Sequence, residues 1–251
     1  MKYPSLRSIP LNRAVSSLAT SFILLAGVGC NTTPPSSPEL TGVGESPYPD
    51  PARFEQDIAA FEAADAPSMP PTDAILFIGS SSITMWNAQL PEDMAPLTVI
   101  PRGFGGSTMQ DLIHYADRVV FPYQPKAIVV YEGDNDVAFG ISPERFFERL
   151  QVFVQMVDER LPDTEIYFLS IKPSGSRWSL WPEMERANDL IRNYTQGRDD
   201  LHYIDVASPL LNEAGEPESS YFIEDNLHLS PEGYAVWTEV VKGRLLETYA
   251  E

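Results

Sequence analysis

Residues 74–82 have the sequence Ala-Ile-Leu-Phe-Ile-Gly-Ser-Ser-Ser, and this stretch decides the fold class. Five apolar residues in a row followed by a glycine are typical of a β-strand that is buried on both faces, as the strands of parallel sheets are. Four later segments have the same short apolar character and predict further strands. They span residues 97–100, 127–131, 165–169 and 201–205.

Segments of helical length separate these strands. Phe54, Ile58 and Phe61 share one face of a helix that precedes the first strand. Such alternation of strands and helices implies right-handed crossovers between parallel strands. The sequence therefore predicts an α/β fold, a three-layer αβα sandwich around a mostly parallel sheet. Further helices are expected near residues 107–119, 142–160 and 181–197.

Two helix starts carry a clear signal. The tripeptide Ser-Pro-Glu occurs at residues 142–144 and again at residues 230–232. In each case a hydroxyl stands at the N-cap, proline takes the first helical position, and an acid lies in the first turn. We therefore expect helices to begin directly after Ser142 and Ser230.

The composition narrows the class of protein. The chain has 251 residues, with 17 Lys and Arg against 36 Asp and Glu, which gives a formal net charge of −19. Nucleic-acid binding relies on clustered cations, so this balance argues against nucleic acid as a partner. The single cysteine, Cys30, rules out both an intramolecular disulfide framework and a zinc site of several cysteines. The length fits one domain with appendages.

The N-terminus is typical of an export signal. Residues 1–29 contain three basic residues and no acid, and residues 22–26 form an apolar centre. The apolar stretch is shorter than the about 20 residues of a membrane-spanning helix and is interrupted by serine and threonine. Leu25-Ala26-Gly27-Val28-Gly29-Cys30 resembles the cleavage box of bacterial lipoproteins, which predicts lipidation of Cys30. The alternative is plain secretion with a free thiol.

A tether is expected between this signal and the folded domain. Residues 31–50 contain five prolines and almost no large apolar side chains, so they cannot bury enough surface to offset the entropy of ordering. The predicted organisation is a signal at residues 1–29, a tether at 30–50 and one domain at 51–251. The protein would be exported from a bacterial cytoplasm and held in the cell envelope by the lipid on Cys30.

Polar residues follow the predicted strands where a parallel sheet binds its ligands. Residues 79–82 (Gly-Ser-Ser-Ser) follow the first strand, residues 103–106 (Gly-Phe-Gly-Gly) the second, and residues 133–136 (Gly-Asp-Asn-Asp) the third. Asp225 and His228 stand just before the last helix. Each group alone is also typical of a turn or a helix entry. Together they supply a hydroxyl nucleophile, a base with a carboxylate to orient it, and oxyanion donors.

These four blocks resemble, in order and approximate spacing, those of the SGNH hydrolases, also called GDSL-type esterases and lipases. The resemblance runs from about residue 74 to the last helix and is strongest with the branch of the catalytic subunits of platelet-activating-factor acetylhydrolase. It implies a flavodoxin-like sheet of five parallel strands and hydrolysis of carboxylic esters. It also implies these roles: Ser81 as nucleophile, Asp225 and His228 as the rest of the triad, and Ser81, Gly106 and Asn135 as oxyanion donors.

The chain departs from the family pattern in two places. Ser80 replaces the acid that commonly precedes the nucleophile, and Pro101-Arg102 stands where an asparagine often precedes the glycines of the second block. Three adjacent serines make the choice of nucleophile depend on register, and we favour Ser81 because it stands two residues after Gly79. An α/β-hydrolase fits worse, because its Gly-x-Ser-x-Gly elbow would need glycine at Ile83.

No cofactor or metal is implied. His114 and His202 lie in a predicted helix and strand and are interpreted as structural, and the three histidines are not clustered. Trp178 and Trp181, after the fourth strand, would form either a substrate-binding rim or ordinary packing against the next helix. Without a lid-like apolar insertion we expect small acyl groups, such as acetate on a carbohydrate or short-chain esters.

Two alternatives remain open. The first is a non-catalytic envelope lipoprotein that binds carbohydrate in the same cleft. The second is a different acyl hydrolase, such as a thioesterase, lysophospholipase or peptidase, because these enzymes share the same catalytic groups. The sequence motifs do not separate them.

Overall fold

The computed structural model describes residues 48–249. The predicted export signal, Cys30 and the tether up to residue 47 lie outside the described residues. Within the described part, no helix combines the length and apolar character needed to cross a membrane.

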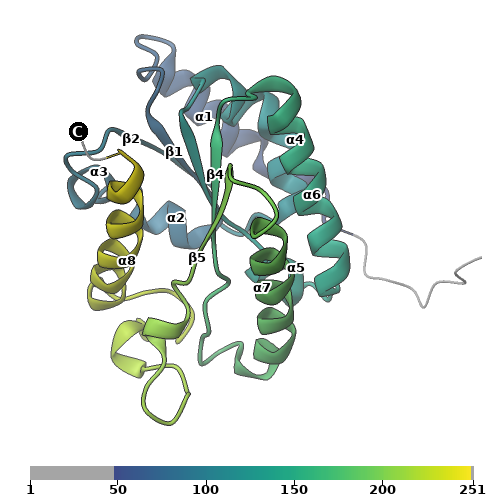
Figure 1. The fold of residues 1–251 in the computed structure, drawn as a ribbon, viewed down its shortest axis with the longest axis vertical. Helices are drawn as coiled ribbons and strands as arrows, with labels where there is room; N and C mark the ends of the chain where they lie inside the picture. The colour runs from purple at the N-terminus through teal and green to yellow at the C-terminus, as the bar shows by residue number, and fades with distance from the viewer. Residues whose placement is uncertain (1–47, 250–251) are drawn as a thin grey trace, which may run out of the picture. The chain divides into compact units, whose positions relative to one another are not determined.

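A parallel sheet forms the centre of the domain (Figure 1). In residues 48–249 it has five strands in the order β2-β1-β3-β4-β5, and every pair of neighbours is parallel. This is the strand order of flavodoxin-like folds. The α/β prediction and the five-stranded parallel sheet are therefore confirmed. The strands are β1 (Ile75–Gly79), β2 (Val99–Gly103), β3 (Ala127–Tyr131), β4 (Glu165–Leu169) and β5 (Leu201–Ile204).

Helices cover both faces of the sheet (Figure 1). One face is covered by α1 (Glu55–Asp65), α4 (Met109–Val119), α6 (Pro143–Arg160) and α7 (Trp181–Thr195). The opposite face is covered by α2 (Ser81–Trp86), α3 (Leu90–Asp93) and α8 (Pro231–Tyr249). A further short helix, α5 (Asp134–Ala138), follows β3.

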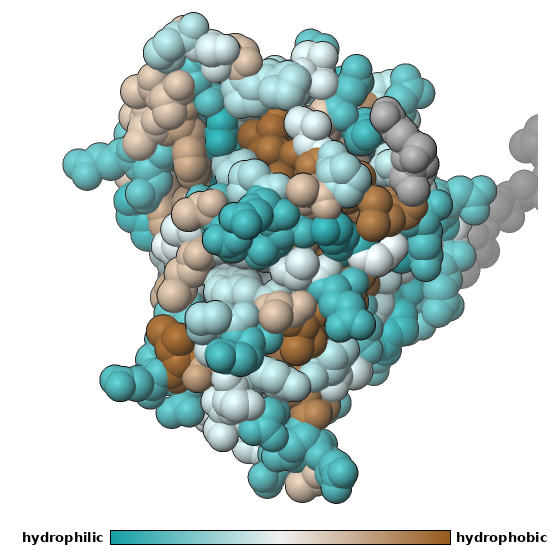
Figure 2. Space-filling model, turned by 90° about the vertical axis from the view of Figure 1, so that its left-hand side faces the viewer, coloured by the Kyte–Doolittle hydropathy of each residue, from teal (hydrophilic) through white to brown (hydrophobic). Residues whose placement is uncertain are grey.

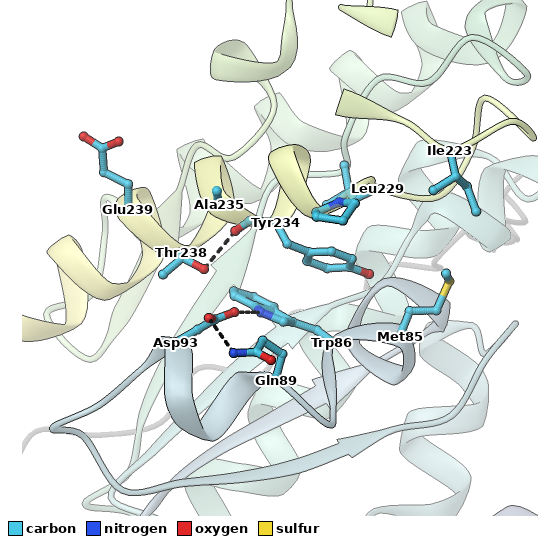
Figure 3. Close-up of a pocket in the computed structure, with 11 residues that line it drawn as sticks. Met85, Trp86, Gln89, Asp93, Ile223, Leu229, Tyr234, Ala235, Thr238 and Glu239 are labelled. Carbon is cyan, nitrogen blue, oxygen red and sulfur yellow. Dashed lines mark hydrogen bonds between the residues drawn. The ribbon is translucent and has the colours of Figure 1, made fainter. Parts of the chain in front are cut away.

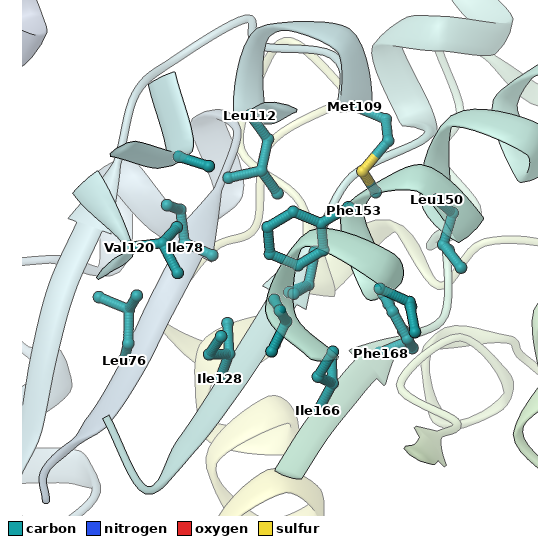
Figure 4. Packing of buried hydrophobic residues seen from close by; sticks show 14 of the residues in the cluster. Leu76, Ile78, Met109, Leu112, Val120, Ile128, Leu150, Phe153, Ile166 and Phe168 are labelled. Atoms are coloured by element: carbon teal, nitrogen blue, oxygen red, sulfur yellow. The ribbon is translucent and has the colours of Figure 1, made fainter. Parts of the chain in front are cut away.

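Successive side chains of β1 point to opposite faces of the sheet and belong to the two halves of the core. Leu76 and Ile78 pack toward α4 and α6, whereas Ile75 and Phe77 pack toward α2 and α8. Figure 4 shows the first of these clusters, in which strand side chains such as Ile128 meet Leu112 and Phe153 from the helices. Because both faces are buried, the strand sequence is continuously apolar rather than alternating.

The structure corrects some element boundaries. The second strand was predicted at residues 97–100 but lies at Val99–Gly103, so it continues through Pro101. It is an edge strand, and an edge strand tolerates a proline that cannot donate to a ladder. The short helices α2, α3 and α5 were not predicted. Both predicted N-caps are confirmed: Ser142 Oγ accepts the Arg145 N–H at 3.3 Å and Ser230 Oγ accepts the Gly233 N–H at 3.2 Å.

Gly79 ends β1 in a conformation that fits only glycine well. Its φ is +146°, and a Cβ at this position would lie 2.1 Å from the carbonyl oxygen of Tyr131 on β3. The missing side chain lets the two strand ends approach closely just before Ser81.

We therefore expect Gly79→Ala to lower the free energy of unfolding by at least about 3 kcal/mol, because the clash is with main chain that cannot move aside alone. Gly215→Ala is the matched control, since Gly215 also has a positive φ of +76° but open space around it. That change should cost only about 1–2 kcal/mol. Urea unfolding of both variants measures the difference, and equal losses would contradict the steric explanation.

Candidate active site

The ends of three strands meet beside Ser81. The Ser80 N–H donates to the Tyr131 carbonyl at 3.2 Å, and the Phe104 N–H donates to the Gly79 carbonyl at 2.9 Å. A Cβ on Gly105 would lie 3.8 Å from the Cα of Ser81. The loops after β1, β2 and β3 thus converge at the point where the strand order reverses, which is where doubly wound sheets bind ligands.

Ser81, His228 and Asp225 form a continuous hydrogen-bonded chain. His228 Nε2 lies 3.0 Å from Ser81 Oγ, and His228 Nδ1 lies 2.6 Å from Asp225 Oδ2. Ser81 and His228 are 147 positions apart in the sequence, so the fold creates the contact. In this geometry the imidazole can accept the Ser81 proton at Nε2 while the carboxylate fixes the tautomer at Nδ1.

A tight turn holds the Asp225 carboxylate. Its second oxygen, Oδ1, accepts the backbone N–H groups of Leu227 and His228, both at 2.9 Å. Asn226, which directly follows Asp225, has a φ of +53°. Burial raises the pKa of Asp225. The hydrogen bonds from the His228 ring and from these two N–H groups outweigh burial and lower the pKa to about 2. Asp225 is therefore ionised at neutral pH.

The three adjacent serines occupy different environments. Ser80 and Ser82 are both 1% exposed, whereas Ser81 has intermediate exposure. The carbonyl of Ser82 accepts the Tyr234 hydroxyl at 2.8 Å, which ties α2 to α8. Within residues 48–249, the hydroxyl that meets a histidine is that of Ser81.

Three groups in the loops after β1, β2 and β3 are candidate oxyanion donors. The backbone N–H groups of Ser81 and Gly106 donate to no residue that the structure describes. Gly106 has a φ of +90°, and a Cβ there would meet nothing within 4 Å, so it faces open space. Asn135, which is 8% exposed, donates through Nδ2 to the Ser107 carbonyl at 2.9 Å and keeps a second amide hydrogen. This set can stabilise an oxyanion.

Arg177 and Lys172 were missed as site residues by the sequence reasoning. Arg177 Nη1 and Nη2 each lie 3.1 Å from Asn135 Oδ1, and Arg177 also pairs with Asp134. Lys172 is fully buried and pairs with Asp134 at 3.2 Å. Burial raises the pKa of Asp134, but the charges of Lys172 and Arg177 outweigh it and lower the pKa. A signal existed, since both cations follow the fourth strand at the edge that carries the site.

Buried carboxyl groups lie behind the second and third loops. The Ser107 hydroxyl donates to Glu132 Oε1 at 2.5 Å, and burial raises the pKa of Glu132 well above its ordinary value. Asp136 accepts the Tyr48 hydroxyl at 3.0 Å and the Met109 N–H at 3.3 Å. Burial is the largest influence on Asp136 and raises its pKa to about 7 despite these hydrogen bonds.

The tryptophan candidates form a stacked pair, with ring centroids 6.0 Å apart and an angle of 13° between planes. Trp181 is 9% exposed and belongs to the core under α7, while Trp178 is half-buried and follows Arg177. The other histidines lie apart from Ser81. His202 stacks on Tyr167 and bonds Glu165 at 2.9 Å, and His114 is exposed.

A mostly apolar groove of about 790 Å³ separates α2 and α3 from α8 (Figure 3). Met85 stands one helical turn after Ser81, and Leu229 follows His228, so the groove begins next to the triad. Met85 and Ile223 at this end are 47% and 38% exposed. Figure 2 shows the face that carries α8, where apolar patches lie between hydrophilic side chains. Trp86 and Tyr234 also line the groove.

The part of the chain that the structure describes contains no candidate metal site. No group of three or more His, Cys, Asp or Glu side chains there is arranged to hold an ion.

The chain is similar in sequence to known acylhydrolases. Residues 72–236, which include all the site residues above, match the model of the GDSL-like lipase/acylhydrolase family. The platelet-activating factor acetylhydrolase IB subunit alpha1 of Pongo abelii is 28% identical over 181 residues, or 70% of this chain and 77% of that protein.

Solved structures share the fold. A GDSL-like lipase from Bacteroides thetaiotaomicron has a TM-score of 0.65 at 17% identity, covering 76% of this chain and 97% of that one. A mutant of an acetylxylan esterase from Geobacillus stearothermophilus has a TM-score of 0.56 at 13% identity, covering 69% and 94%.

The raised pKa of Asp136 gives a testable pH dependence. The ordinary pKa is about 3.9, so between about pH 4 and pH 7 the folded state holds a proton that the unfolded state has lost. Asp136 therefore makes the protein less stable as pH rises through this window. We expect Asp136→Asn to gain stability over the wild type between pH 5 and pH 8, by at most about 4 kcal/mol at about 1.4 kcal/mol per pKa unit. Thermal melts across this range measure it, and a pH-independent difference would contradict it.

Proposed function

The chain belongs to the GDSL-like lipase/acylhydrolase family and is a hydrolase that acts on ester bonds, and from this premise we propose that it is a serine esterase that works through an acyl-enzyme on Ser81. The observation that carries the proposal is the hydrogen-bonded chain from Ser81 through His228 to Asp225, with distances of 3.0 and 2.6 Å. The resemblance noted in the sequence is confirmed at the level of the family.

The first half-reaction begins with attack by Ser81 Oγ on the ester carbonyl carbon. His228 Nε2 takes the hydroxyl proton as the new bond forms, and the carbonyl π electrons move to oxygen. The oxyanion then accepts hydrogen bonds from the N–H groups of Ser81 and Gly106 and from the Asn135 amide. When the tetrahedral intermediate collapses, the bond to the alcohol oxygen breaks and the alcohol leaves with the proton from His228.

The second half-reaction uses water in place of the alcohol. His228 Nε2 takes a proton from water, whose oxygen attacks the acyl carbon, and the bond to Ser81 Oγ breaks as the proton returns to that oxygen. Asp225 is ionised throughout, since its pKa is about 2, so it balances the positive charge that appears on the imidazole in both halves.

For the substrate we propose carboxylic esters with short acyl groups, acetyl among them. Ser81 is partly exposed, and the described residues contain no lid-like apolar insertion over it. The fold is shared with an acetylxylan esterase, which agrees with this proposal. The apolar groove beside the triad offers a place for an uncharged part of the substrate.

Of the alternatives, the non-catalytic one is weaker. A purely carbohydrate-binding lipoprotein would not need a triad in hydrogen-bonding geometry. A thioesterase or lysophospholipase would use the same groups, and a substrate panel separates these activities.

For the location we propose export and attachment to the cell envelope through a lipid on Cys30, with secretion as the alternative. The support is the sequence of residues 1–30, and the net charge of −19 makes adsorption to anionic lipid head groups unfavourable.

Hydrolysis of p-nitrophenyl esters from C2 to C12 tests the mechanism and the acyl preference. Ser81→Ala and His228→Ala should reduce kcat by about 10⁶, and Asp225→Asn by about 10⁴, because the wrong tautomer faces Ser81. Wild-type rates should be highest at C2 to C4. Circular dichroism verifies that each variant folds. Activity confined to C8 and longer would contradict the short-acyl proposal, and an active Ser81→Ala would contradict the acyl-enzyme.

Cys30→Ser in the full chain tests the location. Expressed with its own N-terminus in a bacterium, the wild type should sediment with membranes and incorporate radiolabelled palmitate, whereas the variant should do neither. Equal sedimentation of both forms, with no label, would contradict lipidation.

A further inference from the structure

Arg177 contacts the side-chain amide of Asn135, one of the proposed oxyanion donors, at its carbonyl oxygen. It lies in the loop after β4, and both of its terminal nitrogens reach Asn135 Oδ1 at 3.1 Å. Resting on the proposed esterase function, we propose that Arg177 is a positioning residue that fixes the Asn135 side-chain amide with its NH₂ group toward the reacting carbonyl.

The first step of the argument is the orientation of the amide. An asparagine amide that turned by 180° would present its oxygen to the oxyanion and would repel it. Arg177 has only donors, so the atom facing it must be the amide oxygen. The Ser107 carbonyl only accepts, so the atom facing it at 2.9 Å must be the nitrogen. Both ends of the amide are therefore fixed in the orientation that catalysis needs.

The second step is that Arg177 is itself held. It pairs with Asp134, which is 5% exposed and also contacts the fully buried Lys172 at 3.2 Å and the Tyr131 hydroxyl at 3.3 Å. One carboxylate thus faces two cations, and the group carries one net positive charge. A guanidinium anchored in this way cannot swing away from Asn135 without breaking a buried ion pair.

The third step is electrostatic. The positive charge sits on the carbonyl side of the amide, so it polarises Asn135 and strengthens its N–H donors, since linked hydrogen bonds reinforce one another where water is excluded. Lysine cannot replace this function fully, because a single ammonium group lacks the planar fork that spans Asp134 and Asn135 together.

A double-mutant cycle on kcat tests the proposal. Arg177→Ala should lower kcat of the wild type by about 10–100-fold, less than the about 10²–10³ for loss of a whole oxyanion donor. KM should change less than about threefold, because the amide acts mainly in the transition state. In an Asn135→Ala background, Arg177→Ala should have no further effect on kcat, because the group it positions is gone.

Two further variants and an added ion distinguish a positioning role of Arg177 from a general effect on protein stability. Arg198→Ala is the matched control, because Arg198 also forms ion pairs with two carboxylates, Asp158 and Asp200, but contacts no site residue. It should lower the melting temperature without changing kcat. Arg177→Lys should lie between wild type and Arg177→Ala, and millimolar guanidinium ion should restore part of the activity to Arg177→Ala but not to Asn135→Ala.

Equal factors for Arg177→Ala in the two backgrounds, or no loss in the wild-type background, would overturn the proposal. Should Arg177→Ala fail to fold, Arg177→Lys takes its place in the cycle. NMR of the Asn135 side-chain NH₂ gives a readout without turnover: two sharp signals in the wild type should broaden or merge in the variant, and unchanged signals would overturn the proposal. A wild type that is inactive on every ester would instead count against the proposed function.

Discussion

The close approach of β1 and β3 is the constraint on which the rest of the site depends. Gly79 lies so near the Tyr131 carbonyl that a Cβ would be 2.1 Å from it, and the chain leaves both strands directly into functional residues. Ser81 comes two residues after Gly79, and Asn135 comes four residues after Tyr131. The proposed nucleophile and the proposed amide donor thus follow strand ends that are held together by main-chain packing, which is what a preorganised site requires.

Charge inside the domain is arranged in compensated groups, although the surface is strongly acidic. Asp134 has two cations, whereas Glu132 and Asp136 have raised pKa values because burial disfavours their ionised forms. These acids lie between the loops that carry Gly106 and Asn135. In its protonated form, neither acid carries a charge that would repel the oxyanion of the proposed reaction. The cations therefore favour an ionised carboxylate at Asp134, whereas burial favours the neutral forms of Glu132 and Asp136.

The sequence predicted the features that depend on local patterns of residues. Continuous apolar runs located the strands, because both faces of a parallel sheet are buried, and Ser-Pro-Glu located two helix starts. It placed β2 at residues 97–100, whereas the strand spans Val99–Gly103 and continues through Pro101 at the edge of the sheet. It missed α2 and α5, which are one or two turns long and stabilised by packing rather than propensity. It also missed Arg177, because the contact with Asn135 joins loops 42 residues apart and local patterns do not show such contacts.

Ser80 and Arg102, which depart from the family pattern, are both buried. Ser80 stands at the start of α2, is 1% exposed, and donates its backbone N–H to the Tyr131 carbonyl, a contact that any residue except proline could make. Arg102 turns into the core, where it pairs with Asp65 and Tyr123 at 2.5 and 2.6 Å. The proposed oxyanion donors come from the loops after three strands, and their alignment depends on the register of β2, β1 and β3. Under our proposal, Arg177, from the loop after a fourth strand, positions one of these donors without touching the substrate.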